Sequence, residues 1–345
     1  MDTKYVKYAQ EKTFELLEID SPTGYTEAGA KWVKETFDEL GFDAKYTNKG
    51  GVFVDLGGGD AQGALLLQGH IDTIGGMVRE IKSNGRLHLT QLGGLHPDNA
   101  ETENVRVRTR DGKCYEGTFQ LINPSAHVNP DAPTTLRTWE TTEVVLDEDV
   151  KSADDVRALG IEVGDIVCFE PRTRLTEKGF IKSRFLDDKL CVGILIAFAK
   201  AISDGALTLS RRVYIHFTIY EEVGYGGPGM CPEGVTDGIA LDMGCVGEGI
   251  TGDEHKVSIC AKDAFGPYSY VLTSALIEAA KKEGADYAVD VYPKYSSDID
   301  TTIRSGADIR HGLIGPGIFA SHGYERGHMD GVLNTLKVLK GYCTK

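Results

Sequence analysis

The sequence predicts an α/β fold: a mixed, largely parallel sheet flanked by helices, with a small inserted domain that resembles a β-barrel. Strand and helix patterns alternate in the first and last parts of the chain, an order typical of parallel sheets covered by helices. One strand pattern contains three consecutive leucines, Leu65–Leu67, so both of its faces are expected to be buried at the centre of a sheet. From residue 77 onwards, short segments of alternating polarity indicate antiparallel strands instead.

The first part of the chain is expected to form two helices followed by two strands. Apolar residues recur at helical spacing, and the Ser-Pro-Thr-Gly sequence at 21–24 ends the first helix with turn chemistry. Gly41 is expected to end the second helix. The predicted ranges are Tyr5–Ile19 and Glu27–Leu40 for the helices, and Val52–Leu56 and Ala64–Gln68 for the strands.

The middle of the chain is predicted to be a separate β-rich domain. We place it at residues 77–181, so that residues 1–76 and 182–345 together form the α/β domain. Asp111-Gly112 lies between two alternating segments and indicates a hairpin, and Ser152 is a suitable N-cap for a short helix. We expect the insert to contribute to oligomerisation, because the strand edges of a small inserted domain need cover.

Alternation of helix and strand resumes after the insert, which completes the expected sheet. No internal repeat or low-complexity tract interrupts it. The predicted helices are Leu190–Ile202, Ser269–Glu283 and Met329–Lys340, and the predicted strands are Val213–Tyr220, Gly238–Asp242, Tyr287–Tyr292 and Leu313–Ile314.

Charge and composition disfavour several classes of protein. The 345 residues include 37 Lys and Arg against 52 Asp and Glu, a formal net charge of −15, so we expect neither nucleic acid nor an anionic membrane as a partner. The longest apolar run, Cys191–Ala199, is far shorter than the roughly 20 residues that span a bilayer. The amino-terminal segment is charged throughout, unlike a secretory signal. The seven cysteines include no CxxC pair. We therefore expect a cytoplasmic protein.

Polar residues that suit metal binding follow the predicted strands, where the functional crevice of an open α/β sheet lies. Imidazole and carboxylate groups suit Zn²⁺ or a similar divalent ion, and five such ligands suit two ions that share one carboxylate. The segments that carry these groups are His70-Ile71-Asp72, Asp187-Asp188-Lys189, Glu221-Glu222, Asp242 and His322.

Each segment alone has a simpler explanation. A His-x-Asp triplet is common in turns, and an acidic pair before a helix interacts favourably with the helix dipole. His328 competes with His322 for any metal role. Glu221 and Glu222, however, directly follow the apolar pattern YIHFTIY, where two adjacent acids need a reason. Taken together and in this order, the segments favour a metal centre.

Two further features of the sequence bear on the site. Asp298 follows a predicted strand and is either a helix N-cap or part of the wall of a pocket. The glycine cluster at 224–229 lacks the GxxxxGK[ST] order of a phosphate-binding loop, so we reject that interpretation.

With these motifs in this order, the sequence resembles the tetrahedral-type dinuclear metallo-aminopeptidases of the M42 peptidase family, which includes glutamyl and deblocking aminopeptidases and proteins labelled FrvX or cellulase M. The resemblance covers essentially the whole chain. It includes the position of the insert, since 187 − 70 = 117 residues separate His70 from Asp187. Thr73, Lys189 and the Ser-His-Gly-Tyr-Glu context of His322 depart from the family pattern.

The resemblance implies a metallo-exopeptidase-like fold and a role for each polar residue. Two divalent ions roughly 3.5–4 Å apart would hold a hydroxide between them and polarise a peptide carbonyl, with Zn²⁺ as the expected metal and cobalt or manganese as alternatives. The implied roles are His70 and Asp242 on one metal, Glu222 and His322 on the other, Asp187 as the bridging ligand, Glu221 as general base, and Asp72 as a carboxylate that orients His70.

The predicted activity is removal of amino-terminal residues from peptides by a homo-oligomer, which in this family is a tetrahedral dodecamer with interior active sites. A metal-dependent deacylase or amidohydrolase that acts on N-acyl amino acids or small amides is the alternative. A glycosidase would not need histidine ligands, and the intact Glu221 argues against a non-catalytic peptide-binding protein. The preferred amino-terminal residue and the native metal stay open.

Overall fold

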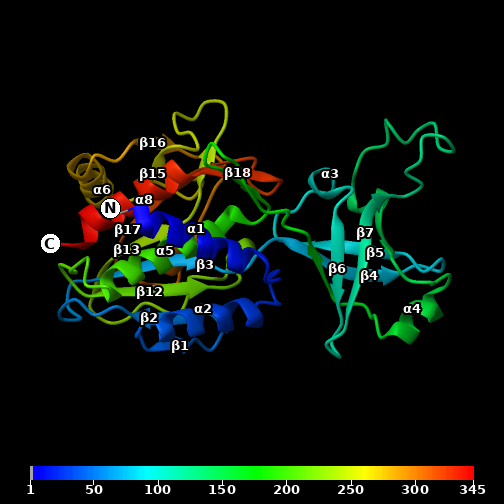
Figure 1. Ribbon diagram of the computed structural model, residues 1–345, viewed down its shortest axis with the longest axis horizontal. Helices are drawn as coiled ribbons and strands as arrows, with labels where there is room; N and C mark the ends of the chain where they lie inside the picture. The colour runs from blue at the N-terminus through cyan, green and yellow to red at the C-terminus, as the bar shows by residue number, and fades with distance from the viewer. Residues whose placement is uncertain (1–2) are drawn as a thin grey trace. The chain divides into compact units, whose positions relative to one another are not determined.

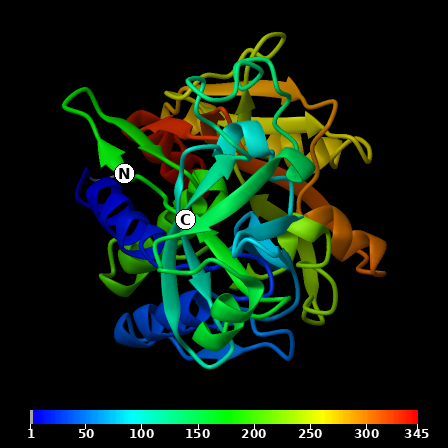
Figure 2. The same ribbon diagram turned by 90° about the vertical axis from the view of Figure 1, so that its right-hand side faces the viewer.

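The computed structural model describes residues 3–345, which form two compact units (Figures 1 and 2). The larger unit comprises the chain up to Asp72 together with Arg172–Lys345, and the smaller unit is Thr73–Pro171. The smaller unit ends earlier than the predicted position 181. The reason is that the next segment forms β10 (Arg174–Leu175) and β11 (Phe180–Ser183), and β11 pairs with a strand near the end of the chain.

The larger unit is built on a 12-stranded mixed sheet. Its main path runs β1-β2-β12-β3-β13-β17-β18-β11-β10. The ladders that join β12, β3, β13 and β17 are parallel, whereas the pairs towards both ends of the path are antiparallel. The predicted fold class, a mixed and largely parallel sheet flanked by helices, is confirmed.

The elements of the larger unit agree with most of the predicted ranges. Its helices are α1 (Thr3–Leu17), α2 (Glu27–Glu39), α5 (Leu186–Ser203), α6 (Tyr270–Glu283), α7 (Asp298–Arg304) and α8 (Met329–Cys343). Its remaining strands are β1 (Ala44–Tyr46), β2 (Val52–Asp55), β3 (Ala64–His70), β12 (Val213–Thr218), β13 (Val235–Leu241), β14 (Gly244–Val246), β15 (Val257–Lys262), β16 (Tyr287–Val291), β17 (Arg310–Phe319) and β18 (Glu325–His328).

Strand β3 occupies the centre of the sheet. All seven of its residues are buried, because β12 and β13 flank it and both α5 and α7 contact it. Its three leucines therefore place apolar side chains on both faces, as their sequence predicts.

Helices α1 and α5 cross at very short distance. The crossing depends on Gly193, where a Cβ atom would collide with the hydroxyl of Thr13 and lie 2.7 Å from the carbonyl oxygen of Ala9. Close contact lets α5 bury almost its whole surface, which agrees with the long apolar run in its sequence.

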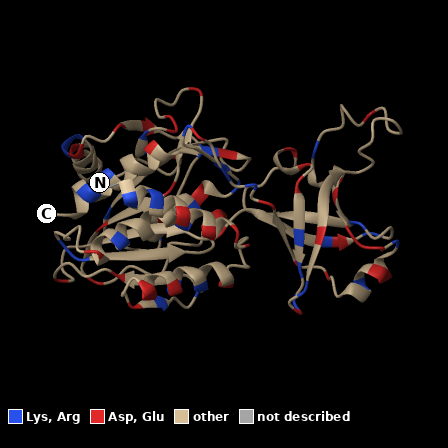
Figure 3. Cartoon of the chain, in the orientation of Figure 1, with Lys and Arg blue, Asp and Glu red and all other residues tan. Residues whose placement is uncertain are grey.

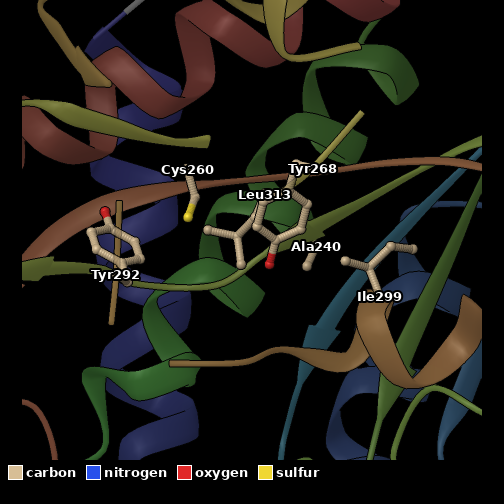
Figure 4. Packing of buried hydrophobic residues seen from close by; sticks show 6 residues of the cluster. All are labelled: Ala240, Cys260, Tyr268, Tyr292, Ile299 and Leu313. Atoms are coloured by element: carbon tan, nitrogen blue, oxygen red, sulfur yellow. The ribbon is translucent and has the colours of Figure 1, made fainter. Parts of the chain in front are cut away.

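A cluster of buried apolar residues packs α7 against the sheet (Figure 4). It joins side chains from β13, β15, β17 and α7 with two tyrosines from the connecting segments. This packing matters for the site described below, because the residues at the start of α7 reach it. The members are Ala240, Cys260, Tyr268, Tyr292, Ile299 and Leu313.

Several predicted boundaries differ from the structure, among them those of β12, α5 and β17. Strand β12 ends at Thr218 rather than Tyr220, because Tyr220 has a φ of 69° and the chain continues into a 3₁₀-helix, η2 (Glu221–Val223). Helix α5 begins at Leu186, earlier than predicted. Strand β17 has ten residues rather than two, because its glycines, which hid the strand pattern, allow close contact with neighbouring backbone.

The smaller unit is a closed antiparallel barrel with strand order β4-β5-β8-β7-β6-β9 (Figure 1). The predicted β-barrel-like insert is confirmed. A closed barrel leaves no strand edge to cover, so that reason for self-association is wrong. Its elements are β4 (Gly75–Ile81), β5 (Leu87–Leu92), α3 (Pro97–Ala100), β6 (Asn104–Arg108), β7 (Cys114–Leu121), η1 (Trp139–Thr141), β8 (Thr142–Leu146), α4 (Ala153–Leu159) and β9 (Ile166–Phe169).

Acidic and basic residues are interspersed over both units, as Figure 3 shows. No helix within residues 3–345 has the length and apolar character needed to cross a membrane.

Candidate active site

The candidate site lies at the carboxyl ends of adjacent parallel strands. His70 is the last residue of β3, and it is paired with Thr218, the last residue of β12. Glu221 and Glu222 follow in η2, and Asp242 comes directly after β13. The register of the parallel strands therefore brings these side chains together, as the sequence predicts.

Two other segments complete the site. Asp187 and Asp188 lie in the first turn of α5, and His322 lies in the turn between β17 and β18 with a φ of 64°. Glu325, which is 2% exposed, connects the two segments. It accepts the backbone N–H of His322 and the backbone N–H of Asp187, each at 3.1 Å.

Glu325 was missed by the sequence analysis. Its signal was an acidic residue close after His322 at the start of a strand, but the sequence does not show that this side chain turns inward.

The carboxylate of Asp187 lies between the two histidines. Its Oδ1 is 3.2 Å from Nε2 of His70, and its Oδ2 is 3.6 Å from Nε2 of His322. The same nitrogen of His322 is 3.5 Å from Oε2 of Glu222. Oε2 of Glu221 lies 3.7 Å from Nε2 of His70, the nitrogen that also faces Asp187. The two oxygens of one carboxylate thus face two different imidazoles.

These separations fit metal ligands. Two ligand atoms on a tetrahedral zinc ion, with bonds of about 2.0–2.1 Å, lie about 3.3 Å apart. The His70, Asp187 and Glu222 side chains offer atoms that all lie within 4.8 Å of one another, and so do His70, Asp188 and Asp242. His70 belongs to both groups. The donor set is imidazole and carboxylate, which suits zinc and related divalent ions.

Asp242 and Asp188 are both fixed by hydrogen bonds. Oδ2 of Asp242 accepts the hydroxyl of Ser297 at 2.6 Å. Oδ2 of Asp188 accepts the backbone N–H of His70 at 3.1 Å, while its Oδ1 has no hydrogen-bond partner among residues 3–345. Asp188 is fully buried beside His70 and adds a carboxyl group to the residues predicted from the sequence, although burial raises its pKa well above the usual range.

Asp72 contacts His70 differently from the expectation. Nδ1 of His70 bonds to the main-chain carbonyl of Asp72 at 2.9 Å, whereas the carboxylate oxygen is 3.7 Å away. The carboxylate instead accepts the backbone N–H groups of Glu221 and Glu222, at 3.1 and 3.4 Å, and the hydroxyl of Thr23 at 2.7 Å. Asp72 therefore fixes the tautomer of His70 through its backbone and positions η2 through its side chain.

The carboxyl groups of the site disfavour one another's ionisation. Burial and neighbouring acids raise the pKa of Glu221 and of Glu222 well above the usual range, and they raise the pKa of Asp242 to about 7. Burial also opposes ionisation of Asp187, but its hydrogen bond with His70 holds its pKa below the usual value. Divalent cations would relieve this repulsion, so the charge of the site agrees with its donor chemistry.

The structure also places His328 and Asp298, whose roles the sequence left open. His328 bonds through Nε2 to the carbonyl of Lys178 at 2.7 Å and stacks on His255, so it is not grouped with Asp187. Asp298 is the first residue of α7 and not its N-cap. Ser297 is the cap, in a reciprocal capping box with Asp300.

Buried imidazole and carboxylate groups at the carboxyl edge of an α/β sheet are typical of metal-dependent hydrolases. The chain matches the family described as M42 glutamyl aminopeptidase over residues 50–338, and it belongs to this family of metal-dependent peptidases. The family predicted from the motifs is confirmed, and with it a hydrolase that acts on peptides as an aminopeptidase.

Relatives with described names agree with this assignment. The chain is 41% identical over 337 residues to YhfE of Bacillus subtilis (strain 168), which is named as a candidate aminopeptidase, with coverage of 98% of this chain and 97% of that protein. A lysyl aminopeptidase of Pyrococcus furiosus is 26% identical over 231 residues, which cover 65% of this chain and 64% of that protein.

Solved structures show the same fold. A TET aminopeptidase from a marine sediment archaeon, Thaumarchaeota archaeon SCGC AB-539-E09, superposes with a TM-score of 0.88 at 17% identity over 98% of this chain and 97% of its own. The TET1 peptidase of Pyrococcus horikoshii has a TM-score of 0.86 at 22% identity, over 98% of this chain and 99% of its own. That protein can assemble into a tetrahedron or a large octahedral shell.

Proposed function

We propose that this aminopeptidase uses two divalent metal ions, zinc in the first instance, that share the carboxylate of Asp187. The observation that carries the proposal is that the two oxygens of Asp187 face His70 and His322 separately. His70 and Asp242 would complete one ligand set, and Glu222 and His322 would complete the other. When bound, such ions polarise the substrate carbonyl and lower the pKa of a water molecule.

Glu221 is assigned as the general base. It is the one member of the Glu221–Glu222 pair that is left outside the proposed ligand sets, and its carboxylate lies within 3.7 Å of His70. Adjacent residues of a 3₁₀-helix point in directions about 120° apart, so the two carboxylates serve different roles. Glu221 accepts a proton from the attacking water and gives it to the leaving amine. Asp72 supports both residues by holding their backbone N–H groups.

Metal content measured beside rate tests these roles. We expect the metal-free protein to be inactive and about two zinc, cobalt or manganese ions per chain to restore activity. Glu221→Gln should lose ~10²–10⁴-fold in turnover with its metal content nearly unchanged, because it removes only the proton acceptor. Asp187→Ala should lose metal. A fully active protein without metal, or a Glu221→Gln variant with normal turnover, contradicts the proposal.

The substrate is proposed to be a peptide with a free amino terminus. A panel of aminoacyl chromogenic substrates, compared with the matching N-acyl amino acids, separates this activity from that of a deacylase. Hydrolysis of the N-acyl compounds alone would favour the alternative. The preferred amino-terminal residue is read from the same panel.

We also propose that the chain forms a closed homo-oligomer, such as a dodecamer, to which the barrel unit contributes. Support comes from the assembly named for the Pyrococcus horikoshii peptidase, whose fold this chain shares. In the barrel unit, the side chains of Val128, Leu136 and Val163 are more than 60% exposed, so they are available for contact with another copy of the chain. Light scattering on the protein and on Leu136→Asp tests this: a monomer at micromolar concentration refutes it, and dissociation of the variant supports it.

A further inference from the structure

The carboxylate of Asp298 is buried in the larger unit but only half satisfied. Its side chain is 3% exposed. Oδ1 accepts the backbone N–H of Gly227 at 2.7 Å, while Oδ2 has no hydrogen-bond partner among residues 3–345. Burial raises the pKa of this carboxyl to about 6, and the neighbouring Thr218 hydroxyl opposes the shift. A buried carboxylate in this position needs a cation or a further donor.

Its two neighbours place Asp298 at the candidate active site. Ser297, the preceding residue, donates its hydroxyl to Asp242 at 2.6 Å. Thr218, whose hydroxyl lies beside Asp298, is paired with His70 in the ladder between β12 and β3. Asp298 therefore borders two of the residues that we assign to one metal, although it belongs to neither proposed ligand set.

The glycine cluster after η2 is shaped around this carboxylate. A Cβ atom at Gly226 would overlap the carboxylate of Asp298, and one at Gly227 would overlap the backbone oxygen of the same residue. Lys49 holds the cluster from the other direction, since its ammonium group donates to the carbonyls of Tyr225 and Gly226 at 2.6 Å each. The glycine cluster at 224–229 thus covers the carboxylate of Asp298.

Three other buried acids lie around the site: Asp72, Glu325 and Asp188. None of them belongs to a proposed ligand set or acts as the base, and each has a structural partner. Asp72 holds the backbone of η2 and the hydroxyl of Thr23. Both oxygens of Glu325 accept backbone N–H groups. Asp188 also has one oxygen without a hydrogen-bond partner among the described residues, but its other oxygen accepts the backbone N–H of His70, and the residue lies against the thiol of Cys191. Asp298 is thus a buried acid at the site with one oxygen held by a backbone N–H and the other without a hydrogen-bond partner among the described residues.

We propose that Oδ2 of Asp298 binds the protonated α-amino group of the peptide substrate, while Gly227 holds Oδ1 and so fixes the orientation of the carboxylate. This inference rests on the proposed aminopeptidase site. An ammonium group supplies the N–H donors that Oδ2 lacks, together with a positive charge. An N-acylated peptide supplies neither charge nor ammonium, so the same contact selects free amino termini. A charge-assisted hydrogen bond of this kind accounts for a preference of about 10–100-fold.

The test uses two hydroxamate inhibitors that differ only in the α-amino group: leucine hydroxamate and 4-methylpentanoic hydroxamate. Their dissociation constants are measured by calorimetry on the metal-loaded protein, on Asp298→Asn and on Asp300→Asn. Asn at 298 keeps an oxygen for the N–H of Gly227 and removes the charge. Asp300 is the matched control, because it is a buried acid of the same helix that bonds to Ser297 and Tyr268. Metal content is measured for all three proteins.

We expect the parent protein and Asp300→Asn to bind the amino compound about 10–100-fold more tightly than the des-amino compound. Asp298→Asn should lose most of this preference, with unchanged metal content and unchanged affinity for the des-amino compound. The same preference in Asp298→Asn as in the parent overturns the inference and leaves the proposed function standing. A parent that binds metal but neither hydroxamate contradicts the proposed function itself.

A crystal structure of the unsubstituted protein with leucine hydroxamate gives a second measurement that does not depend on a variant. An amino nitrogen at hydrogen-bond distance from Oδ2 of Asp298 supports the inference, and an amino nitrogen placed on other groups overturns it.

Discussion

Replacing Glu325 by Gln tests whether a residue that positions the metal ligands, without being a ligand itself, affects metal binding. Glu325 accepts one N–H from His322 with one oxygen and one N–H from Asp187 with the other. A glutamine has a single acceptor oxygen, so its NH₂ group must face one of these N–H donors. A buried donor left without an acceptor costs about 1–3 kcal/mol.

That cost falls on Asp187 and His322, two of the proposed metal ligands. We expect the free energy of unfolding of Glu325→Gln to fall by about 1–3 kcal/mol. We expect its metal affinity to fall by about 10–100-fold, as for other residues that support metal ligands. Calorimetric unfolding and metal titration against a competing chelator measure the two effects.

Gly193→Ala is the control, because it perturbs the crossing of α1 and α5 through Thr13 and not the ligands. Destabilisation of both variants with metal loss confined to Glu325→Gln supports the reasoning. Equal metal loss in the two variants, or normal metal affinity in Glu325→Gln, refutes it.

Three further predictions follow from single contacts. Gly193→Ala should lower the free energy of unfolding by about 1–3 kcal/mol, the usual cost of overpacking. An unchanged denaturant midpoint would contradict the argument that this position has no room for a Cβ atom. His322→Ala should weaken one metal site and largely spare the other, so metal titration should show one tight ion and one weak ion per chain. Burial lowers the pKa of His216 to about 3, so between about pH 6.5 and 3 the unfolded chain binds a proton that the folded chain does not. The free energy of unfolding should therefore fall on acidification through this window, by up to about 1.4 kcal/mol per pH unit. His216→Leu should reduce this dependence on pH, and an unchanged dependence contradicts a lowered pKa for His216.

Local patterns in the sequence determined the architecture and most of the site. The three leucines of β3 are apolar on both faces, which only the centre of a covered sheet satisfies, and all seven residues of the strand are buried. The register of parallel strands then brings together the residues that follow them, so His70, Glu221, Glu222 and Asp242 could be grouped from their positions after strand patterns. Hydrophobic periodicity carries this information, because it is a local property of the chain.

Contacts between distant segments were decided only by the tertiary structure. The sequence favoured His322 but left His328 as a competitor. The turn after β17 places His322 at 3.6 Å from Asp187, whereas β18 directs His328 to Lys178. The partners of Glu325 and the backbone bonds of Asp72 depend on where donors from other segments arrive, and a sequence does not state those positions. The closure of the barrel is likewise a pairing between strands far apart in the chain, which removed the edges that alternation alone suggested. The sequence thus determines which residue types form the site, while the packed fold determines which atom each side chain contacts.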